Sequence, residues 1–338
     1  MRRSTALAVA VAVGLALAGV GAPATAAPTT GVTAAPVRAS DGAYVSRETV
    51  VAPRQVDLTI ESPALGRAAN VRLLTPDGWE QRRPGDRWPV LYLLHGCCDS
   101  YVSWTRSTDV ASIPELRKVL VVMPEAGAAG WYSNWWNGGA GATPAWETFH
   151  LGEVRQITER GYGAGPRRAV AGLSMGGFGA MSYAARNPGM FRAAASFSGV
   201  VHPLRDASFW LPFFGFSGQD PDDLWGDPVA QRDIWAAHDP VALAKRLRHT
   251  ALFVATGDGT AGGPFDAPDR TDALEALIHA ENVVFVDRLR ELGIRVTTDL
   301  YGPGTHSWPY WQRELHRALP MLLDALGTGR GVASQAAR

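Results

Sequence analysis

Short apolar segments alternate with helical patterns along most of the chain. Several of the apolar segments are uninterrupted, as expected of strands covered on both faces of a sheet. Strands are predicted over residues 56–60, 69–74, 90–94, 119–123, 168–171, 193–197, 251–255 and 296–301, and helices over 178–186 and 311–326. Strands that alternate with helices predict an α/β fold with one mostly parallel, doubly wound central sheet.

The first residues follow a different pattern. Arg2 and Arg3 precede an uncharged apolar run over residues 6–20, and an A-x-A site ends at Ala26. This pattern predicts a cleavable signal peptide over residues 1–26. The run is short for a bilayer span and no charges follow it to stop transfer, so a membrane anchor is the weaker reading. The mature protein is expected to be secreted and extracellular, without stable membrane insertion.

Composition sets the remaining boundaries. Residues 27–52 are rich in Ala, Thr, Pro, Gly and Val without periodicity, which predicts a flexible lead-in. No linker-like stretch interrupts the later series of strands and helices. Residues 53–328 are therefore expected to form a single domain, followed by a disordered tail over residues 329–338.

The overall charge is balanced. The chain has 32 Lys and Arg residues against 32 Asp and Glu residues, so its formal net charge is zero. This balance offers no long-range attraction to nucleic acid or to an anionic membrane, and neither partner is expected. The sequence leaves the oligomeric state open.

A nucleophile motif stands between a predicted strand and a predicted helix. Residues 172–176 read Gly-Leu-Ser-Met-Gly and match G-x-S-x-G, which in this context is typical of the α/β-hydrolase fold. Ser174 is the predicted nucleophile, held on a sharp turn at a helix N-terminus. The backbone N–H of Met175 is then one expected oxyanion donor. The second is expected from the loop after strand 90–94, where Cys97 is the candidate.

The nucleophile needs a base and an orienting acid. Of eight histidines, only His306 lies in a glycine-flanked loop after the last predicted strand, where this fold places its base. The acid must lie between Ser174 and His306 in chain order. Asp258 directly follows strand 251–255, whereas Glu275 begins a later helix. Position alone favours Asp258, and both remain candidates.

Two further features accompany these residues. Cys97 and Cys98 are the only cysteines. Export favours a disulfide, but adjacent cysteines close only a strained ring, so free thiols or pairing with another chain remain alternatives. An aromatic run that includes Phe213 and Phe214 lies in a segment interrupted by Pro and Gly. We expect it to line an acyl pocket, with ordinary core packing as the alternative.

Residues 172–181, 304–311 and 146–149 together resemble the secreted mycolyltransferases of the antigen 85 complex and the related esterase D-like proteins. The similarity extends over about residues 56–325. It implies that the acid is the Glu of a Leu-Glu pair, which here is Glu275. It also implies that an Asp and an Arg that contact sugar are replaced here by His95 and Cys98. These two residues and Trp308 are the further expected substrate-binding residues.

The resulting prediction is a secreted serine carboxylesterase with a Ser174–His306–Glu275 triad and an acyl-enzyme intermediate. Its substrate would be a small-molecule or lipid acyl ester. The alternative is an acyltransferase that moves the acyl group to a sugar or glycerol hydroxyl. A binding module that has lost catalysis is disfavoured by the intact triad. No metal-ligand cluster or nucleotide-binding loop is present in the sequence, so no metal and no cofactor are expected.

Overall fold

The computed structural model describes residues 36–141, 143–215 and 218–329. The segment predicted as a signal peptide lies outside the described residues. So do the first part of the predicted lead-in and all but the first residue of the predicted tail. Residues 36 onward belong to one compact unit.

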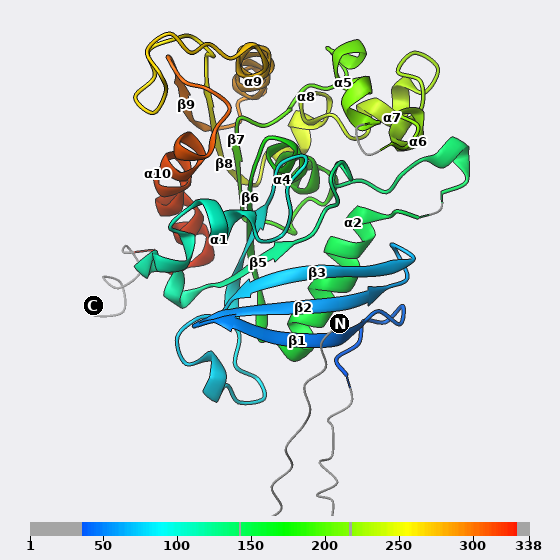
Figure 1. Cartoon of the computed structure of the whole chain (residues 1–338), viewed down its shortest axis with the longest axis vertical. Helices are drawn as coiled ribbons and strands as arrows, with labels where there is room; N and C mark the ends of the chain where they lie inside the picture. The colour runs from blue at the N-terminus through cyan, green and yellow to red at the C-terminus, as the bar shows by residue number, and fades with distance from the viewer. Residues whose placement is uncertain (1–35, 142, 216–217, 330–338) are drawn as a thin grey trace, which may run out of the picture. The chain divides into compact units, whose positions relative to one another are not determined.

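One nine-stranded sheet runs through this unit, in the order β1-β2-β3-β5-β4-β6-β7-β8-β9 (Figure 1). The strands are β1 Tyr44–Ala52, β2 Gln55–Ser62, β3 Arg67–Leu74, β4 Trp88–Leu94, β5 Leu120–Pro124, β6 Ala164–Leu173, β7 Ala193–Phe197, β8 Ala251–Gly257 and β9 Thr297–Tyr301. Strands β1 to β3 pair antiparallel, as do β3 and β5, and the six strands from β5 to β9 are parallel. The predicted mostly parallel sheet is confirmed.

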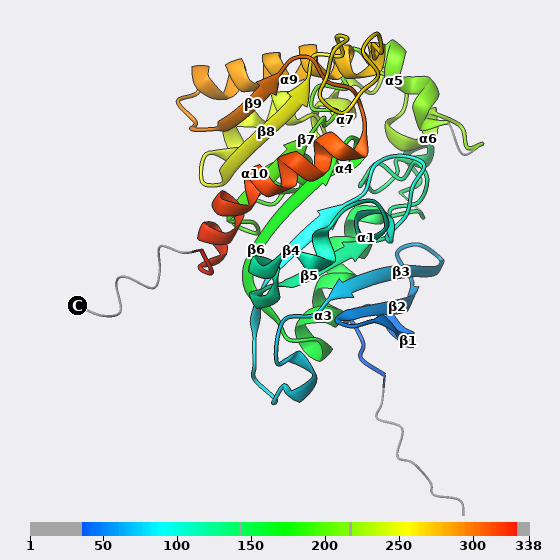
Figure 2. The ribbon, with the colours of Figure 1, turned by 60° about the vertical axis from the view of Figure 1, so that its left-hand side comes forward.

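Helices cover both faces of the sheet. They are α1 Ser103–Ser107, α2 Trp146–Thr148, α3 Arg155–Gly161, α4 Met175–Arg186, α5 Ala207–Phe214, α6 Asp222–Trp225, α7 Arg232–Ala236, α8 Pro240–Leu243, α9 Ala273–Glu291 and α10 Trp308–Leu326. Helices α3, α4 and α9 pack into the core on one face, while α1 and α10 contribute to a separate core on the other (Figure 2). Among the described helices, none is long and apolar enough to cross a membrane.

Strand β4 shows why its sequence is continuously apolar. Val90, Tyr92 and Leu94 point into the core beneath α4, whereas Leu91 and Leu93 belong to the core beneath α10. All five are buried, and full burial of such a side chain contributes about 1.5–3 kcal/mol relative to exposure. Both faces of the strand therefore need apolar residues.

The order of the strands also fixes where a site can form. Strand β4 is followed in sequence by β5 on one side, while β6 lies on its other side. The connections leaving β4 and β6 thus diverge at their carboxyl ends, which is where open α/β sheets bind ligands.

The flexible lead-in predicted over residues 27–52 is wrong for its last nine residues. Residues 44–52 form β1, an edge strand that pairs with β2 in an antiparallel hairpin. Most of its side chains are exposed on both faces, so the strand shows no alternation of apolar and polar positions. Its stability comes from the hydrogen-bonded ladder to β2, which leaves no mark on the hydrophobic pattern.

Candidate active site

Ser174 lies on a sharp turn between β6 and α4. Its backbone has φ 52° and ψ −121°, a conformation that non-glycine residues adopt only under strain, at a cost of about 1–3 kcal/mol. The flanking glycines allow close packing. A Cβ at Gly172 would lie 2.2 Å from the carbonyl oxygen of Gly176, and a Cβ at Gly176 would lie 2.4 Å from that of Leu94. The G-x-S-x-G pattern is therefore a packing requirement at this turn.

His306 lies in the loop between β9 and α10, and its ring contacts a buried carboxylate. The His306 Nδ1 atom is 2.6 Å from Glu275 Oε2, and the Glu275 side chain is 0% exposed. Because an ionised carboxylate only accepts, Nδ1 donates and Nε2 is left as a proton acceptor. The imidazole also packs edge-on against Trp311, with ring centroids 4.9 Å apart.

The buried carboxylate of Glu275 is fully satisfied. Its Oε1 atom accepts hydrogen bonds from Ser198 Oγ (2.7 Å), Thr256 Oγ1 (3.0 Å) and the Gly257 amide (2.8 Å). These donors stabilise a charge that burial would otherwise penalise. The residues that supply them follow β7 and end β8, so two strand ends place the acid. Sequence reasoning missed Ser198 and Thr256, since a single hydroxyl in a strand end carries no motif.

Asp258, the carboxylate favoured by position alone, does not contact His306. Its Oδ1 atom accepts hydrogen bonds from the Thr260 amide (2.8 Å) and from Thr260 Oγ1 (2.6 Å). Asp258 thus stabilises its own turn. The structure pairs Glu275, and not Asp258, with the histidine, whereas the role of Glu275 as the catalytic acid stays a prediction.

A second carboxylate connects the helix of the acid to the loop of the base. Asp272 is the N-cap of α9, and its Oδ1 accepts from the amides of Leu274 and Glu275, each at 3.1 Å. Its Oδ2 accepts from the His306 amide at 3.0 Å. The signal was present in the sequence, because Asp followed three residues later by Glu is a helix-capping pattern.

The loop after β4 lies against the nucleophile. A Cβ at Gly96 would lie 2.6 Å from Leu173 Cδ1 and 3.3 Å from Ser174 Cβ, so a larger residue there would force these side chains to move. In the described part of the chain, the amides of Cys97 and Met175 donate to no acceptor. The Cys98 amide, in contrast, donates to Ala128 O at 2.8 Å. The two amides predicted as oxyanion donors are therefore both available.

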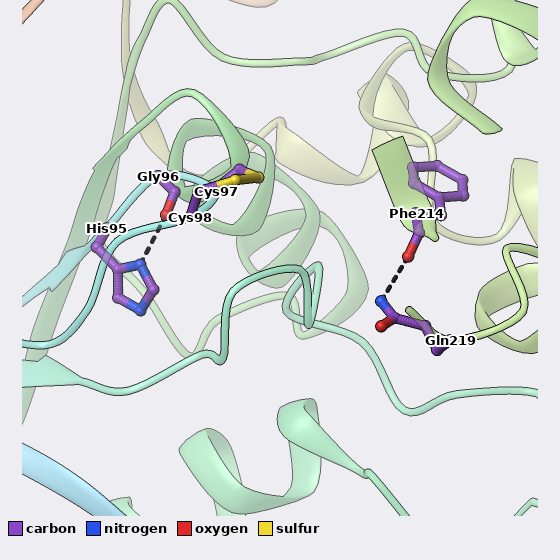
Figure 3. The surroundings of a disulfide bond; sticks show 6 residues. All are labelled: His95, Gly96, Cys97, Cys98, Phe214 and Gln219. Carbon is purple, nitrogen blue, oxygen red and sulfur yellow. Dashed lines mark hydrogen bonds between the residues drawn. A yellow bond between two sulfur atoms is a disulfide. The ribbon is translucent and has the colours of Figure 1, made fainter. Parts of the chain in front are cut away.

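The buried side chain of His95 holds this loop through hydrogen bonds and is not accessible to a substrate. Its side chain is 1% exposed, and Nδ1 donates to Gly96 O at 2.7 Å (Figure 3). Nε2 accepts from the Ala126 amide at 2.9 Å. Tyr132 donates its hydroxyl hydrogen to His95 O at 2.8 Å. The expectation that His95 binds substrate is wrong. Both ring nitrogens are used to hold the loop.

Cys97 and Cys98 form a disulfide, which resolves the alternatives left by the sequence (Figure 3). Among the described residues no cysteine is free. Cys98 is exposed and has a positive φ of 65°. The bond joins the residue predicted to donate to the oxyanion with its neighbour. A role for Cys98 in substrate binding stays a prediction.

The aromatic run of α5 divides between core and surface. Phe214 is 0% exposed and packs against Trp131, Trp225 and Trp235, with ring centroids 4.8, 5.1 and 5.3 Å away. The expectation that Phe214 lines a pocket is therefore wrong, and core packing accounts for it. Its carbonyl accepts from the side-chain amide of Gln219 (Figure 3).

Phe213 and Trp308 remain accessible in part. Phe213 is half-buried and its ring lies 5.3 Å from that of Phe209, which is 42% exposed. Trp308 is half-buried and packs edge-on against Trp104 and Trp311. Phe216 lies outside the described residues.

Within the described residues, no group of three or more His, Cys, Asp or Glu side chains is arranged to hold a metal ion. The arrangement is suited to nucleophilic attack by a serine, with proton transfer through a histidine.

Comparison with known proteins places the chain in a family. The family described as "Putative esterase" matches residues 62–322, which is most of the chain. The chain belongs to this esterase family.

Two relatives show how far the similarity extends. Esterase Rv1288 of Mycobacterium tuberculosis is 34% identical over 256 residues, which cover 72% of this chain but only 53% of that protein, so the chain spans about half the length of this relative. Diacylglycerol acyltransferase/mycolyltransferase Ag85B of Mycobacterium leprae is 30% identical over 290 residues, covering 80% of this chain and 83% of the relative. The expected resemblance to the antigen 85 and esterase group is confirmed.

Solved structures of two bacterial proteins share the fold. MPT51 (FbpC1) of Mycobacterium tuberculosis superposes with a TM-score of 0.64 at 26% identity, covering 82% of this chain and all of that one. An S-formylglutathione hydrolase from Agrobacterium tumefaciens has a TM-score of 0.62 at 17% identity, covering 84% of this chain and 99% of that one. The fold is therefore that of the α/β-hydrolases.

Proposed function

We propose that this chain is a secreted serine carboxylesterase in which Ser174, His306 and Glu275 act as the catalytic triad. The observation that carries the proposal is the pairing of His306 with a buried, fully hydrogen-bonded Glu275, in a chain that also holds Ser174 on a strained turn between β6 and α4. Membership of the esterase family and the similarity to esterases and acyltransferases support the same chemistry.

In the proposed mechanism, His306 Nε2 takes the proton from Ser174 as its oxygen attacks the ester carbonyl. The negative charge that develops on the carbonyl oxygen is stabilised by the amides of Cys97, in the loop after β4, and of Met175, the first residue of α4, where the helix dipole adds to the effect. His306 then protonates the leaving alcohol, and an acyl-enzyme forms. Water, deprotonated by the same histidine, hydrolyses this intermediate.

An acyltransferase is the second candidate, and one observation favours it. The relative Ag85B, 30% identical over most of both chains, is named as a transferase of acyl and mycolyl groups. The two reactions share the acyl-enzyme and differ only in whether water or an alcohol attacks it. The burial of His95 argues against a direct contact with a sugar at that position.

Secretion belongs to the same proposal. The signal-peptide pattern over residues 1–26 supports export, and a disulfide is more stable in an oxidising compartment. Retention of the protein inside producing cells, with the first 26 residues still attached, would contradict this part.

A fluorophosphonate probe and p-nitrophenyl esters test the chemistry together. The wild type should be labelled and should hydrolyse the esters, and Ser174→Ala should lose both properties. Ser208→Ala, an exposed serine on α5, is the matched control and should retain them. Adding glycerol or a sugar and measuring the ratio of transferred acyl group to free acid separates transferase from hydrolase. A wild type that is neither labelled nor active would overturn the proposal.

A further inference from the structure

A second concave site lies at the end of the sheet opposite to the candidate active site. A cleft of about 1080 Å³ opens at the amino ends of β8 and β9. Ser174 follows the carboxyl end of β6, which runs parallel to β8 and β9, and His306 follows the carboxyl end of β9. The cleft and the candidate active site therefore lie at opposite ends of the parallel strands. Nothing in the proposed reaction uses this cleft.

The cleft has a basic lining. Arg248 and His249 come from the segment before β8, Arg290 from the end of α9, and Arg295 from the segment before β9. All four side chains are exposed, and no Asp or Glu lines the cleft. Leu252 and Met321 add apolar surface. The lining thus carries at least three positive charges and no negative charge.

Arg290 has a structural role at the end of α9, whereas Arg248 and Arg295 have no partner among the described residues. Arg290 pairs with Asp287 at 3.2 Å and lies in the last turn of α9, where a cation is favoured by the helix dipole. In the described part of the chain, however, the guanidinium groups of Arg248 and Arg295 form no ion pair and no hydrogen bond. An exposed arginine is ordinarily surrounded by water and separated from other arginines. Their convergence in one concave surface raises the local potential and favours anions.

Two connections elsewhere in the chain carry an excess of acidic residues. Residues 206–239, which follow β7, contain seven Asp and one Arg, and residues 258–272, which follow β8, contain four Asp and one Arg. These connections leave the carboxyl ends of the strands. The net charge of zero therefore combines Asp-rich connections after β7 and β8 with a basic cleft at the amino ends of β8 and β9.

We propose that this cleft binds an extended polyanion, a soluble polymer that carries phosphate or carboxylate groups along its chain. Guanidinium groups present paired donors that match both kinds of anionic oxygen. Several arginines across an open cleft suit repeated charges on one chain better than a single small anion. A polymer held there leaves the carboxyl ends of the strands, with Ser174, facing away from it.

The test measures the affinity of the full-length mature protein for inorganic polyphosphate and for polygalacturonate at several salt concentrations. The two polymers distinguish phosphate from carboxylate as the anionic group. The double variant Arg248→Gln/Arg295→Gln should weaken binding about tenfold or more, and should reduce the slope of log affinity against log salt by roughly two. Arg47→Gln/Arg232→Gln removes the same charge from exposed positions outside the cleft and should change affinity less than about twofold.

Hydrolysis of a soluble p-nitrophenyl ester checks the fold of both double variants and should equal that of the wild type. This readout also separates the inference from the proposed function, since polymer binding does not require esterase activity. An equal loss of polymer affinity in the two double variants would show that only the net charge of the protein matters, and would overturn the proposal. Wild-type affinity in the cleft variant, no binding to either polymer, or binding only to phosphatidylglycerol vesicles would overturn it as well.

Discussion

Asp272 and His306 are joined by a hydrogen bond of 3.0 Å, from the histidine amide to the aspartate Oδ2. The other oxygen of the same carboxylate caps α9, whose first turn carries Glu275. One side chain thus fixes the loop of the proposed base relative to the helix of the proposed acid. We expect the 2.6 Å contact between the His306 and Glu275 side chains to depend on this backbone connection.

Asp272→Ala should therefore affect both stability and catalysis. Loss of the cap is expected to cost about 1 kcal/mol in the free energy of unfolding. Displacement of His306 should lower kcat by roughly tenfold or more with a smaller change in KM, because proton transfer is sensitive to position. Urea unfolding and steady-state kinetics measure the two effects. A variant that is destabilised but keeps wild-type kcat would limit Asp272 to capping.

The two candidate acids should separate clearly on mutation. Glu275→Gln keeps the size of the side chain but removes the charge that stabilises a protonated His306, and kcat should fall by roughly 10³–10⁴-fold. Asp258→Asn, which alters only a surface turn, should keep kcat within about threefold. Circular dichroism confirms folding in each case. The reverse ranking would show that Asp258 is the acid.

Tyr132 supports the oxyanion loop through the carbonyl of His95. Tyr132→Phe removes only the hydroxyl, so the expected cost is about 1 kcal/mol in unfolding free energy. If the loop shifts, kcat should fall roughly tenfold while labelling of Ser174 by a small fluorophosphonate persists. Tyr44→Phe is the matched control, since this half-buried tyrosine lies on β1. Unchanged kcat in Tyr132→Phe would exclude a role in positioning the amides.

Reduction of the Cys97–Cys98 disulfide should lower esterase activity. Two electrons and two protons convert the bond to two thiols and release the loop that carries one proposed oxyanion donor. Dithiothreitol should reduce the kcat of the wild type, and reoxidation should restore it. The double variant Cys97→Ala/Cys98→Ala should start with lower activity and show no response to the reductant. A reductant effect that persists in this variant would point to another cause.

Glu281 predicts a dependence of stability on pH. Burial raises its pKa to about 7, although Trp210 Nε1 and the His202 amide donate to its carboxylate at 2.6 and 3.0 Å. A group whose pKa is raised on folding stabilises the protein below its unfolded pKa, near 4.5, and this contribution is lost as the pH rises through 7.

The variant Glu281→Gln isolates this effect. The amide oxygen can still accept from Trp210 but does not ionise, so the melting temperature should change less between pH 4.5 and pH 7.5 than in the wild type. The difference corresponds to up to about 3 kcal/mol. Thermal unfolding monitored by circular dichroism across this range measures it. Parallel pH profiles of the two proteins would show that Glu281 is not the responsible group.

The sequence was sufficient for the interior of the fold and for part of the site. Strand β4, which is buried on both faces, is continuously apolar, and its predicted range lies within two residues of its bounds, whereas β6 begins four residues before its predicted start. Strand β1 was missed because an exposed edge strand leaves no such pattern. Ser174 was predicted because a nucleophile on a turn needs glycines at fixed spacing.

Contacts that depend on three-dimensional packing could not be predicted in this way. Glu275 in the first turn of α9 meets His306 in the loop after β9, whereas position in the sequence alone favours Asp258 as the acid. The sequence did not distinguish Phe214 in the core from Phe213 at the surface, since both lie in one short helix. His95 looked accessible as part of a loop, although its backbone neighbours use both ring nitrogens.

The backbone at Ser174 has a further meaning. At φ 52° a glycine would relieve the strain, so the most stable version of this chain would carry no hydroxyl at that position. The residue on which the proposed chemistry depends is thus one that folding by itself would not select. A homologue with glycine there would keep the architecture and gain thermal resistance, and it would be inert.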